Sequence, residues 1–409
     1  MERQRTETGA GLLPRVERAL GTGTGTAART SGSGWTRLTL RLPDGGPTVD
    51  VVADTRRPPR GIAYLLPGGG LNFAADFFTP GGPGSSGDAG ASGGWDGSGG
   101  SDGSGGSDGH NLAHRLRHRG LLVVGVTPRE DSATAAEITA AWGLAAHRRD
   151  LAGVVRALDS VLGLPYGYAG HSAGAALALD AASHDDSPRL RRVVVLDTTG
   201  PYTGDLALRA AATRDVYADQ LARGTYATDP GLAALIARAV TDPSASSPVP
   251  WPPNPALRFT HAGLAHFALI RTAALPGPAN WIYTQGHSAG AYAFGATPAE
   301  DRFTLTHTTL GTWHAATAAL GSGLVPTALM RDLAAIWAGD GTTYRIAWDR
   351  IRAEVVWVNT ALGRGDHPGG ADLIRAAGND RVAFTVVPGY GHGDAVWSRT
   401  AAADVWSLF

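Results

Sequence analysis

The alternation of short apolar runs with amphipathic segments between residues 61 and 200 most constrains what this chain can fold into. The apolar runs are GIAYLLP from Gly61, LLVVGV at 121–126 and RRVVVLD at 191–197. Runs of this length are typical of strands that are buried on both faces of a sheet. Between them, residues 147–163 form an amphipathic helical pattern. This strand–helix–strand repetition predicts an α/β fold with a mostly parallel sheet and helices on both faces.

The domain organisation follows from an interruption of this pattern. Residues 201–345 contain several helical patterns but few strand candidates, and apolar runs return at 353–359 and 382–387. A sheet interrupted by a long helical segment predicts a core of residues 35–200 and 346–409. The segment 201–345 is then an inserted helical cap. We expect residues 1–34 to be a flexible N-terminal segment with a short helix between Leu12 and Leu20.

Residues 81–109 have an unusual composition, with 14 Gly, seven Ser and four Asp among 29 positions. Such a segment has too few apolar side chains to form a core, which predicts a flexible surface loop. The alternative is a calcium-binding glycine and aspartate repeat. That repeat needs a nine-residue period with one apolar residue in each unit, and the segment lacks it.

Composition excludes several classes of function. The chain of 409 residues has no cysteine, which excludes disulfides, thiolate catalysis and cysteine-based metal sites. Its 35 basic residues are all Arg, so a phosphate loop with an essential Lys and Schiff-base chemistry are also excluded. A net charge of −1 gives no indication of nucleic-acid binding. Because neither a signal peptide nor an apolar run of 18 residues is present, we expect a cytoplasmic protein without a membrane span.

The pattern Gly-His-Ser-Ala-Gly at 170–174 is the strongest catalytic signal in the sequence. It lies between a predicted strand and a helix of small residues, where a nucleophilic serine stands on a sharp turn. The same five residues recur at 286–290, inside the predicted cap and with no parallel sheet around them. We therefore predict that Ser172 is the nucleophile and that Ser288 is a coincidence of composition.

A glycine-rich bend directly follows the strand that begins at Gly61. Its sequence is PGGGLNF, from Pro67 to Phe73. Backbone amides in such a bend can stabilise the oxyanion that forms during acyl transfer. The predicted donors are the amide of Ala173 and one amide among Gly69, Gly70 and Leu71; the alternative is an ordinary turn.

The predicted base is His392, in the loop PGYGHGD after the last strand. A neutral imidazole there can accept the serine proton and return it to the leaving group. The predicted acid is Asp366, seven residues past the strand at 353–359, because nucleophile, acid and base then follow in that chain order. The competing acid is Asp197, at the end of the strand at 191–197. Asp394 is expected to stabilise the histidine loop.

Taken together, these residues resemble the α/β-hydrolase superfamily over about residues 35–409. Three features are similar to those of serine esterases and lipases. They are the chain order Ser172, Asp366, His392, the sharp turn that carries Ser172, called the nucleophile elbow, and the bend PGGGLNF. The resemblance implies a mostly parallel sheet of about eight strands, with the cap inserted after the sixth strand. It also implies a catalytic triad that needs no cofactor or metal.

The expected function is hydrolysis of a hydrophobic carboxylic ester or lactone through an acyl-enzyme on Ser172. Aromatic residues in the cap favour a bulky apolar acyl substrate. One alternative is an acyltransferase, thioesterase or cyclase of natural-product biosynthesis with the same triad. The other is a binding protein that has kept the fold without the chemistry. An epoxide hydrolase or dehalogenase is disfavoured because the elbow carries Ser instead of Asp. The sequence gives no prediction of the oligomeric state.

Overall fold

A central sheet of nine strands organises this computed structural model, which describes residues 7–21, 27–78 and 111–409. In spatial order the strands are β1 (Ala27–Gly32), β2 (Trp35–Arg41), β3 (Thr48–Asp54), β5 (Leu121–Thr127), β4 (Gly61–Leu66), β6 (Tyr166–His171), β7 (Leu190–Leu196), β14 (Glu354–Thr360) and β15 (Val382–Val387). The six strands from β5 to β15 are parallel to one another, and β1, β2 and β3 join antiparallel. The prediction of a mostly parallel sheet is therefore confirmed.

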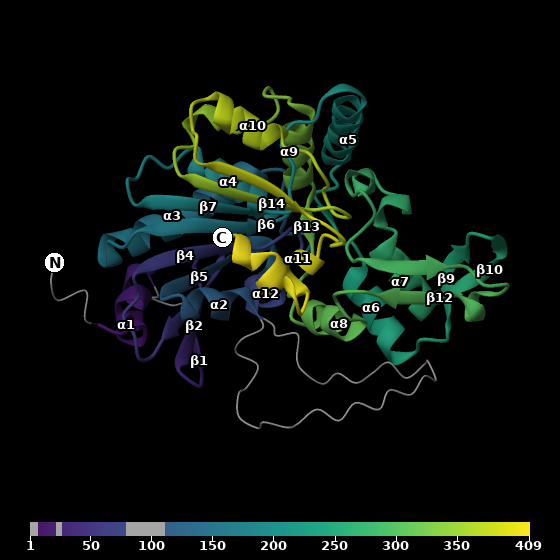
Figure 1. Cartoon of the computed structure of the whole chain (residues 1–409), viewed down its shortest axis with the longest axis horizontal. Helices are drawn as coiled ribbons and strands as arrows, with labels where there is room; N and C mark the ends of the chain where they lie inside the picture. The colour runs from purple at the N-terminus through teal and green to yellow at the C-terminus, as the bar shows by residue number, and fades with distance from the viewer. Residues whose placement is uncertain (1–6, 22–26, 79–110) are drawn as a thin grey trace.

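Helices cover both faces of this sheet (Figure 1). Those of the first face are α1 (Gly9–Ala19), α3 (Leu144–Leu162), α4 (Ala173–Ala182) and α10 (Gly369–Ala376). Those of the second face are α2 (Leu112–His118), α8 (Leu310–Ala318), α11 (Asp394–Trp397) and α12 (Ala401–Asp404). In β4, Tyr64 and Leu66 belong to the core of the first face, and Ala63 and Leu65 belong to that of the second. Because alternate side chains enter two cores, the strand reads as a continuous apolar run.

The N-terminal region differs from its prediction in the part that the structure describes. The helix α1 forms where the sequence predicted a short helix, and it buries Leu12, Leu13 and Val16 in the first core. Residues 27–32 form β1, which pairs with β2 along its whole length. This edge strand is the ninth strand, where the sequence predicted about eight. It was missed because its residues are exposed and its sequence, AARTSG, has no apolar alternation.

The segment 201–345 is divided between two environments. Helices α5 (Gly204–Ala222) and α9 (Thr327–Ala338) pack on each other and join the first core through residues such as Tyr217 and Leu333. Helices α6 (Leu232–Thr241) and α7 (His261–Ile270) lie to one side of the sheet, with a small core of their own (Figure 1).

The sequence predicted a helical cap for this segment, but the segment also contains short strands. Its strands are β8 (Ala227–Thr228), β9 (Ser246–Trp251), β10 (Asn254–Thr260), β11 (Gly290–Ala293), β12 (Arg302–Leu305) and β13 (Val325–Pro326). They pair in three two-stranded sheets. The insertion still follows β7, which is the sixth strand when β1 is not counted.

The remaining sequence predictions concern the glycine-rich segment 81–109 and the membrane span. The glycine-rich segment 81–109 lies outside the described residues. None of the helices that are described combines the length and the apolar character needed to cross a membrane.

Candidate active site

Ser172 stands at the junction of β6 and α4 in a backbone conformation that non-glycine residues rarely adopt. Its φ is 56° and its ψ is −117°, which is the strained geometry expected of a nucleophile elbow. A Cβ at Gly170 would lie 2.0 Å from the carbonyl oxygen of Gly174, and one at Gly174 would lie 2.0 Å from that of Leu66. Both glycines of the pattern are therefore required by close backbone approaches, and the predicted position of Ser172 is reproduced.

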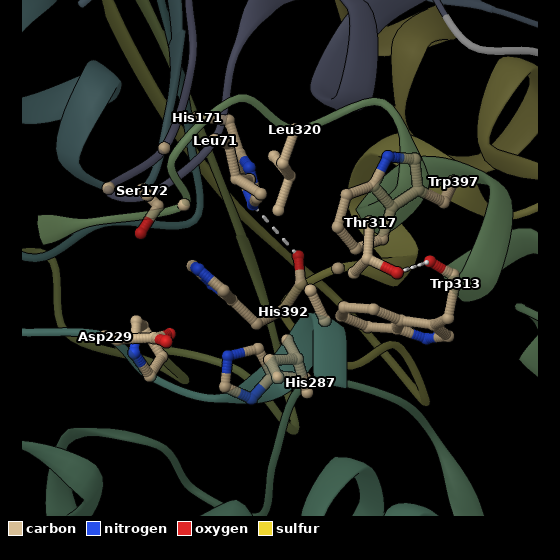
Figure 2. Close-up of a pocket in the computed structure, with 18 of the residues that line it drawn as sticks. Leu71, His171, Ser172, Asp229, His287, Trp313, Thr317, Leu320, His392 and Trp397 are labelled. Carbon is tan, nitrogen blue, oxygen red and sulfur yellow. Dashed lines mark hydrogen bonds between the residues drawn. The ribbon is translucent and has the colours of Figure 1, made fainter. Parts of the chain in front are cut away.

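His392 reaches the same place from the loop that follows β15. Its ring is 4% exposed, and its Nδ1 lies 2.5 Å from Oδ2 of Asp197. Figure 2 shows the ring on the side of the pocket where Ser172 lies, and both side chains line one cavity of about 300 Å³. Among the described residues, Ser172 Oγ forms no hydrogen bond with His392; in free enzymes such bonds are often long and tighten when substrate binds.

The carboxylate against His392 is that of Asp197, which corrects the prediction of Asp366. Asp197 directly follows β7, is fully buried and has a φ of 49°. Its Oδ1 accepts hydrogen bonds from the amides of Thr360 (2.6 Å) and Arg364 (3.2 Å). A Cβ at Gly363 would lie 2.1 Å from Oδ2 of Asp197, so this glycine leaves room for the carboxylate.

The physical reason for the correction lies in the loop after β14. The amide of Gly365 donates to the carbonyl oxygen of Thr360, and Gly365 has a φ of 69°. This tight turn directs the chain away from the site, so that Asp366 is exposed. Because β7 and β14 are adjacent parallel strands, an acid at the end of either can reach the histidine loop. The end of β14 and the loop after it, which were expected to supply the acid, instead supply the two backbone amides that bind Asp197.

The predicted oxyanion loop begins one residue after β4. The amide of Leu71 donates to the carbonyl oxygen of Gly68, which closes a turn and removes Leu71 from the candidate donors. In the described part of the chain, the amides of Gly69, Gly70 and Ala173 donate to no acceptor. A Cβ on Gly69 would lie 3.6 Å from that of Ala173, so these two residues are neighbours across the site. The remaining candidates are therefore Ala173 with Gly69 or Gly70.

His171 and Asp76 form a buried pair beneath the site that the sequence analysis missed. Asp76, in the short π-helix η2 (Ala74–Phe78), accepts from the amide of Gly68 (2.9 Å) and from Nδ1 of His171 (3.0 Å). Nε2 of His171 donates to the carbonyl oxygen of His392 at 3.2 Å. Both ring nitrogens therefore face acceptors, which favours the imidazolium. Burial lowers the pKa of His171, but Asp76 outweighs it and the net direction is upward.

The electrostatic surroundings keep His392 neutral. Burial is the main cause that lowers the pKa of His392 well below its ordinary value, followed by the positive charges of His171 and Arg364. The His171 and His392 rings are in contact at a tilt of 33°, with centroids 4.6 Å apart. Arg364 is 5% exposed and lies 4.5 Å from the ring of Tyr283. A neutral imidazole can accept a proton, so this environment favours His392 as a general base.

The second Gly-His-Ser-Ala-Gly pattern has a structural role. Ser288 is fully buried, and its Oγ accepts from Nε1 of Trp313 at 2.9 Å. The amides of His392 and Gly393 donate to the carbonyl oxygens of Gly286 (3.2 Å) and His287 (2.7 Å). The segment 286–290 therefore holds the histidine loop in place.

Asp394 binds the same two segments together. Its Oδ2 accepts from the amides of Ala289 (2.7 Å) and Gly391 (2.9 Å). The expected role of Asp394 in stabilising the histidine loop agrees with these contacts.

The cavity around Ser172 is lined mostly by apolar side chains, with several polar ones among them. Tyr283 and His287 line it, and the hydroxyl of Tyr283 lies 3.3 Å from Nε2 of His287. Further polar side chains of the lining are Asp229, Thr317 and Ser322. The large apolar side chains of the lining include Leu232, Trp313, Leu320 and Trp397. Other aromatic residues of the insertion, such as Phe259 and Tyr292, belong to its separate core. No group of three or more metal-ligating side chains gathers within the described ranges.

Comparisons with known proteins identify the fold. No protein-family model matches the sequence, and no curated protein matches it. A solved structure of a candidate lipase from Sulfolobus solfataricus superposes with a TM-score of 0.58 at 13% identity, over 94% of this chain and 97% of that chain. A lipase in an open form (TM-score 0.45, 15% identity, 94% and 97% coverage) and an epoxide hydrolase from Vigna radiata (0.44, 14%, 93% and 97%) are more distant.

The first of these superpositions, together with the sheet order and the elbow, establishes that this chain has the α/β-hydrolase fold. At this level of identity the likeness defines the fold alone. The chemistry has to be inferred from the residues of the site.

Proposed function

We propose that this protein is a serine hydrolase that cleaves a hydrophobic carboxylic ester or lactone through an acyl-enzyme on Ser172. The observation that carries the proposal is the convergence of a strained serine elbow, an imidazole and a buried carboxylate 2.5 Å from that imidazole. A binding protein would have no need to maintain this costly arrangement. The Ser at the elbow and the mostly apolar cavity favour esters over epoxides.

The first half-reaction follows from these positions. Ser172 Oγ attacks the carbonyl carbon of the ester and passes its proton to Nε2 of His392. Asp197 accepts the hydrogen bond from Nδ1–H and stabilises the imidazolium. The carbonyl oxygen becomes an oxyanion, which accepts from the amide of Ala173 and that of Gly69 or Gly70. His392 then protonates the leaving oxygen, and the alcohol departs.

The second half-reaction regenerates the enzyme. A water molecule gives a proton to His392 and attacks the acyl-enzyme, and the tetrahedral intermediate breaks down to the free acid and Ser172. A substrate hydroxyl in place of water would give acyl transfer or cyclisation with the same residues. Product analysis with and without an added alcohol distinguishes these outcomes.

The test is covalent labelling with a fluorophosphonate followed by mass spectrometry of the peptides. We expect rapid modification of Ser172, because a base and an oxyanion site activate this hydroxyl. Ser172→Ala should abolish labelling, whereas Ser288→Ala should retain it as the matched control. If folded wild-type protein is not labelled, or if Ser172→Ala is labelled as fast as wild type, the proposal is wrong.

A further inference from the structure

A second cavity, of about 320 Å³, lies at the opposite end of the strands from Ser172. Its lining includes Gly61 and Tyr166, the first residues of β4 and β6, whereas the active-site cavity follows the last residues of the same strands. The six residues of β4 span roughly 20 Å at about 3.3 Å per residue. The two cavities are therefore separate sites on one sheet.

Small residues create this second cavity. On the face of the sheet that carries α2, the first halves of β4 and β6 present Gly61, Ala63, Gly167 and Ala169. Further along β4 the same face carries Leu65, which fills the core. The apolar side chains next to this floor include Leu116, Leu121, Val194 and Phe409. The floor can therefore accept an alkyl chain without burying a polar group.

The charged side chains that line this cavity have one sign. Four arginines line it: Arg60, Arg119, Arg191 and Arg192. No Asp or Glu among the described residues does so. Arg192 pairs with Glu354 at 2.9 Å, and Arg119 donates to the backbone oxygen of Phe409. Arg60 and Arg191 form no ion pair with any residue that the structure describes.

The arginines also act on one another. Burial, and then the positive charges of Arg115, Arg192 and Arg60, lower the pKa of Arg119. Basic side chains are therefore in local excess in the lining, although the whole chain carries a net charge of −1. An anion at the rim would relieve this repulsion and accept charge-assisted hydrogen bonds.

We propose that this cavity binds an amphipathic carboxylate, such as a medium-chain fatty acid anion. The alkyl chain lies on the floor formed by Gly61, Ala63, Gly167 and Ala169, and the carboxylate lies between Arg60 and Arg191. This combination of an apolar floor and unpaired guanidinium groups matches a ligand with one apolar and one anionic end. The proposal does not depend on the chemistry of Ser172.

The experiment measures decanoate binding by isothermal titration calorimetry. Three variants accompany the wild type: Arg60→Gln/Arg191→Gln, which removes the unpaired charges, Ala63→Leu, which fills the floor, and Arg223→Gln/Arg258→Gln. The last is the matched control, because it removes the same charge from exposed arginines outside the cavity. Thermal melts verify that each variant is folded.

We expect saturable binding to wild type and to the control with equal affinity. The Arg60→Gln/Arg191→Gln variant should bind at least about tenfold more weakly, because hydrogen bonds to charged groups contribute strongly to affinity. Folded Ala63→Leu should lose binding, and 1-decanol should bind wild type more weakly than decanoate.

Two results would overturn the proposal. One is the absence of saturable decanoate binding to wild type. The other is equal binding by all three variants, which would place the ligand elsewhere, as in the active-site cavity. Failure of Ser172 to react with a fluorophosphonate would leave this measurement unchanged, so the two proposals fail separately.

Discussion

Replacing Asp197 with Asn should abolish most of the activity by fixing His392 in the wrong tautomer. In the structure, Oδ1 of Asp197 accepts two backbone amides and Oδ2 faces Nδ1 of His392. The asparagine oxygen must take the Oδ1 position, because an NH₂ group there would oppose the amides of Thr360 and Arg364. Its NH₂ group then faces His392 and donates to Nδ1. The ring proton moves to Nε2, which can no longer accept the proton of Ser172.

The expected loss is about four orders of magnitude in kcat, as for the wrong tautomer in comparable triads. At about 1.4 kcal/mol per tenfold change, this corresponds to about 5.5 kcal/mol in the activation free energy. The assay is hydrolysis of a chromogenic ester such as a p-nitrophenyl alkanoate, with thermal melting of each variant alongside.

Asp366→Asn is the matched control, because this carboxylate is exposed and lies in the neighbouring loop. Its kcat should remain within about twofold of wild type, as for most surface substitutions. If Asp366→Asn is the crippling change while Asp197→Asn stays active, the geometric argument fails and the acid is the one that follows β14.

Three further predictions concern the surroundings of the triad. The acid limb of the pH profile of kcat/KM should lie below the ordinary histidine pKa of 6.5, since the pKa of His392 is lowered. Arg364→Met removes one positive charge near His392 and should move this limb to higher pH. An unchanged limb would refute the electrostatic role of Arg364. Gly174→Ala should reduce the free energy of unfolding by more than about 3 kcal/mol, because its Cβ would lie 2.0 Å from a carbonyl oxygen. Gly153→Ala in α3 should stabilise the protein by about 0.5–1 kcal/mol, because no atom lies within 4 Å of the added Cβ. Chemical denaturation compares the two variants. Ser288→Ala should cost about 1–3 kcal/mol of stability, because Nε1 of Trp313 loses its buried acceptor; a measured cost near zero would mean that another acceptor replaces it.

The parts of the fold that could be predicted from sequence are those in which burial imposes a pattern. The runs at 61–66 and 121–126 are apolar because each strand supplies side chains to two cores. The elbow can be recognised from the sequence because close backbone contacts permit only glycine at positions 170 and 174. The strand β1 was not predictable in this way, because all six of its residues are exposed. An exposed edge strand leaves no hydrophobic signal.

The acid could not be assigned from sequence because the two candidates end adjacent parallel strands. Asp197 and Asp366 follow β7 and β14, which lie side by side, and the choice between them depends on a single turn at Gly365. The role of the segment 286–290 was equally hidden. Its contacts with His392 and Gly393 are made by backbone carbonyl groups, which every residue carries.

The attachment of the histidine loop to residues 286–290 limits how the insertion of this protein can be exchanged. Exchanging the whole insertion between β7 and β14 for that of another hydrolase is a common idea for changing substrate range. Here the exchange would also remove the carbonyl groups of Gly286 and His287 that hold the loop of the base. A chimera that retains residues 284–290 should keep a working base, and one that replaces them should have to rebuild it. The insertion is thus a structural support for the histidine loop as well as part of the lining of the cavity that contains Ser172.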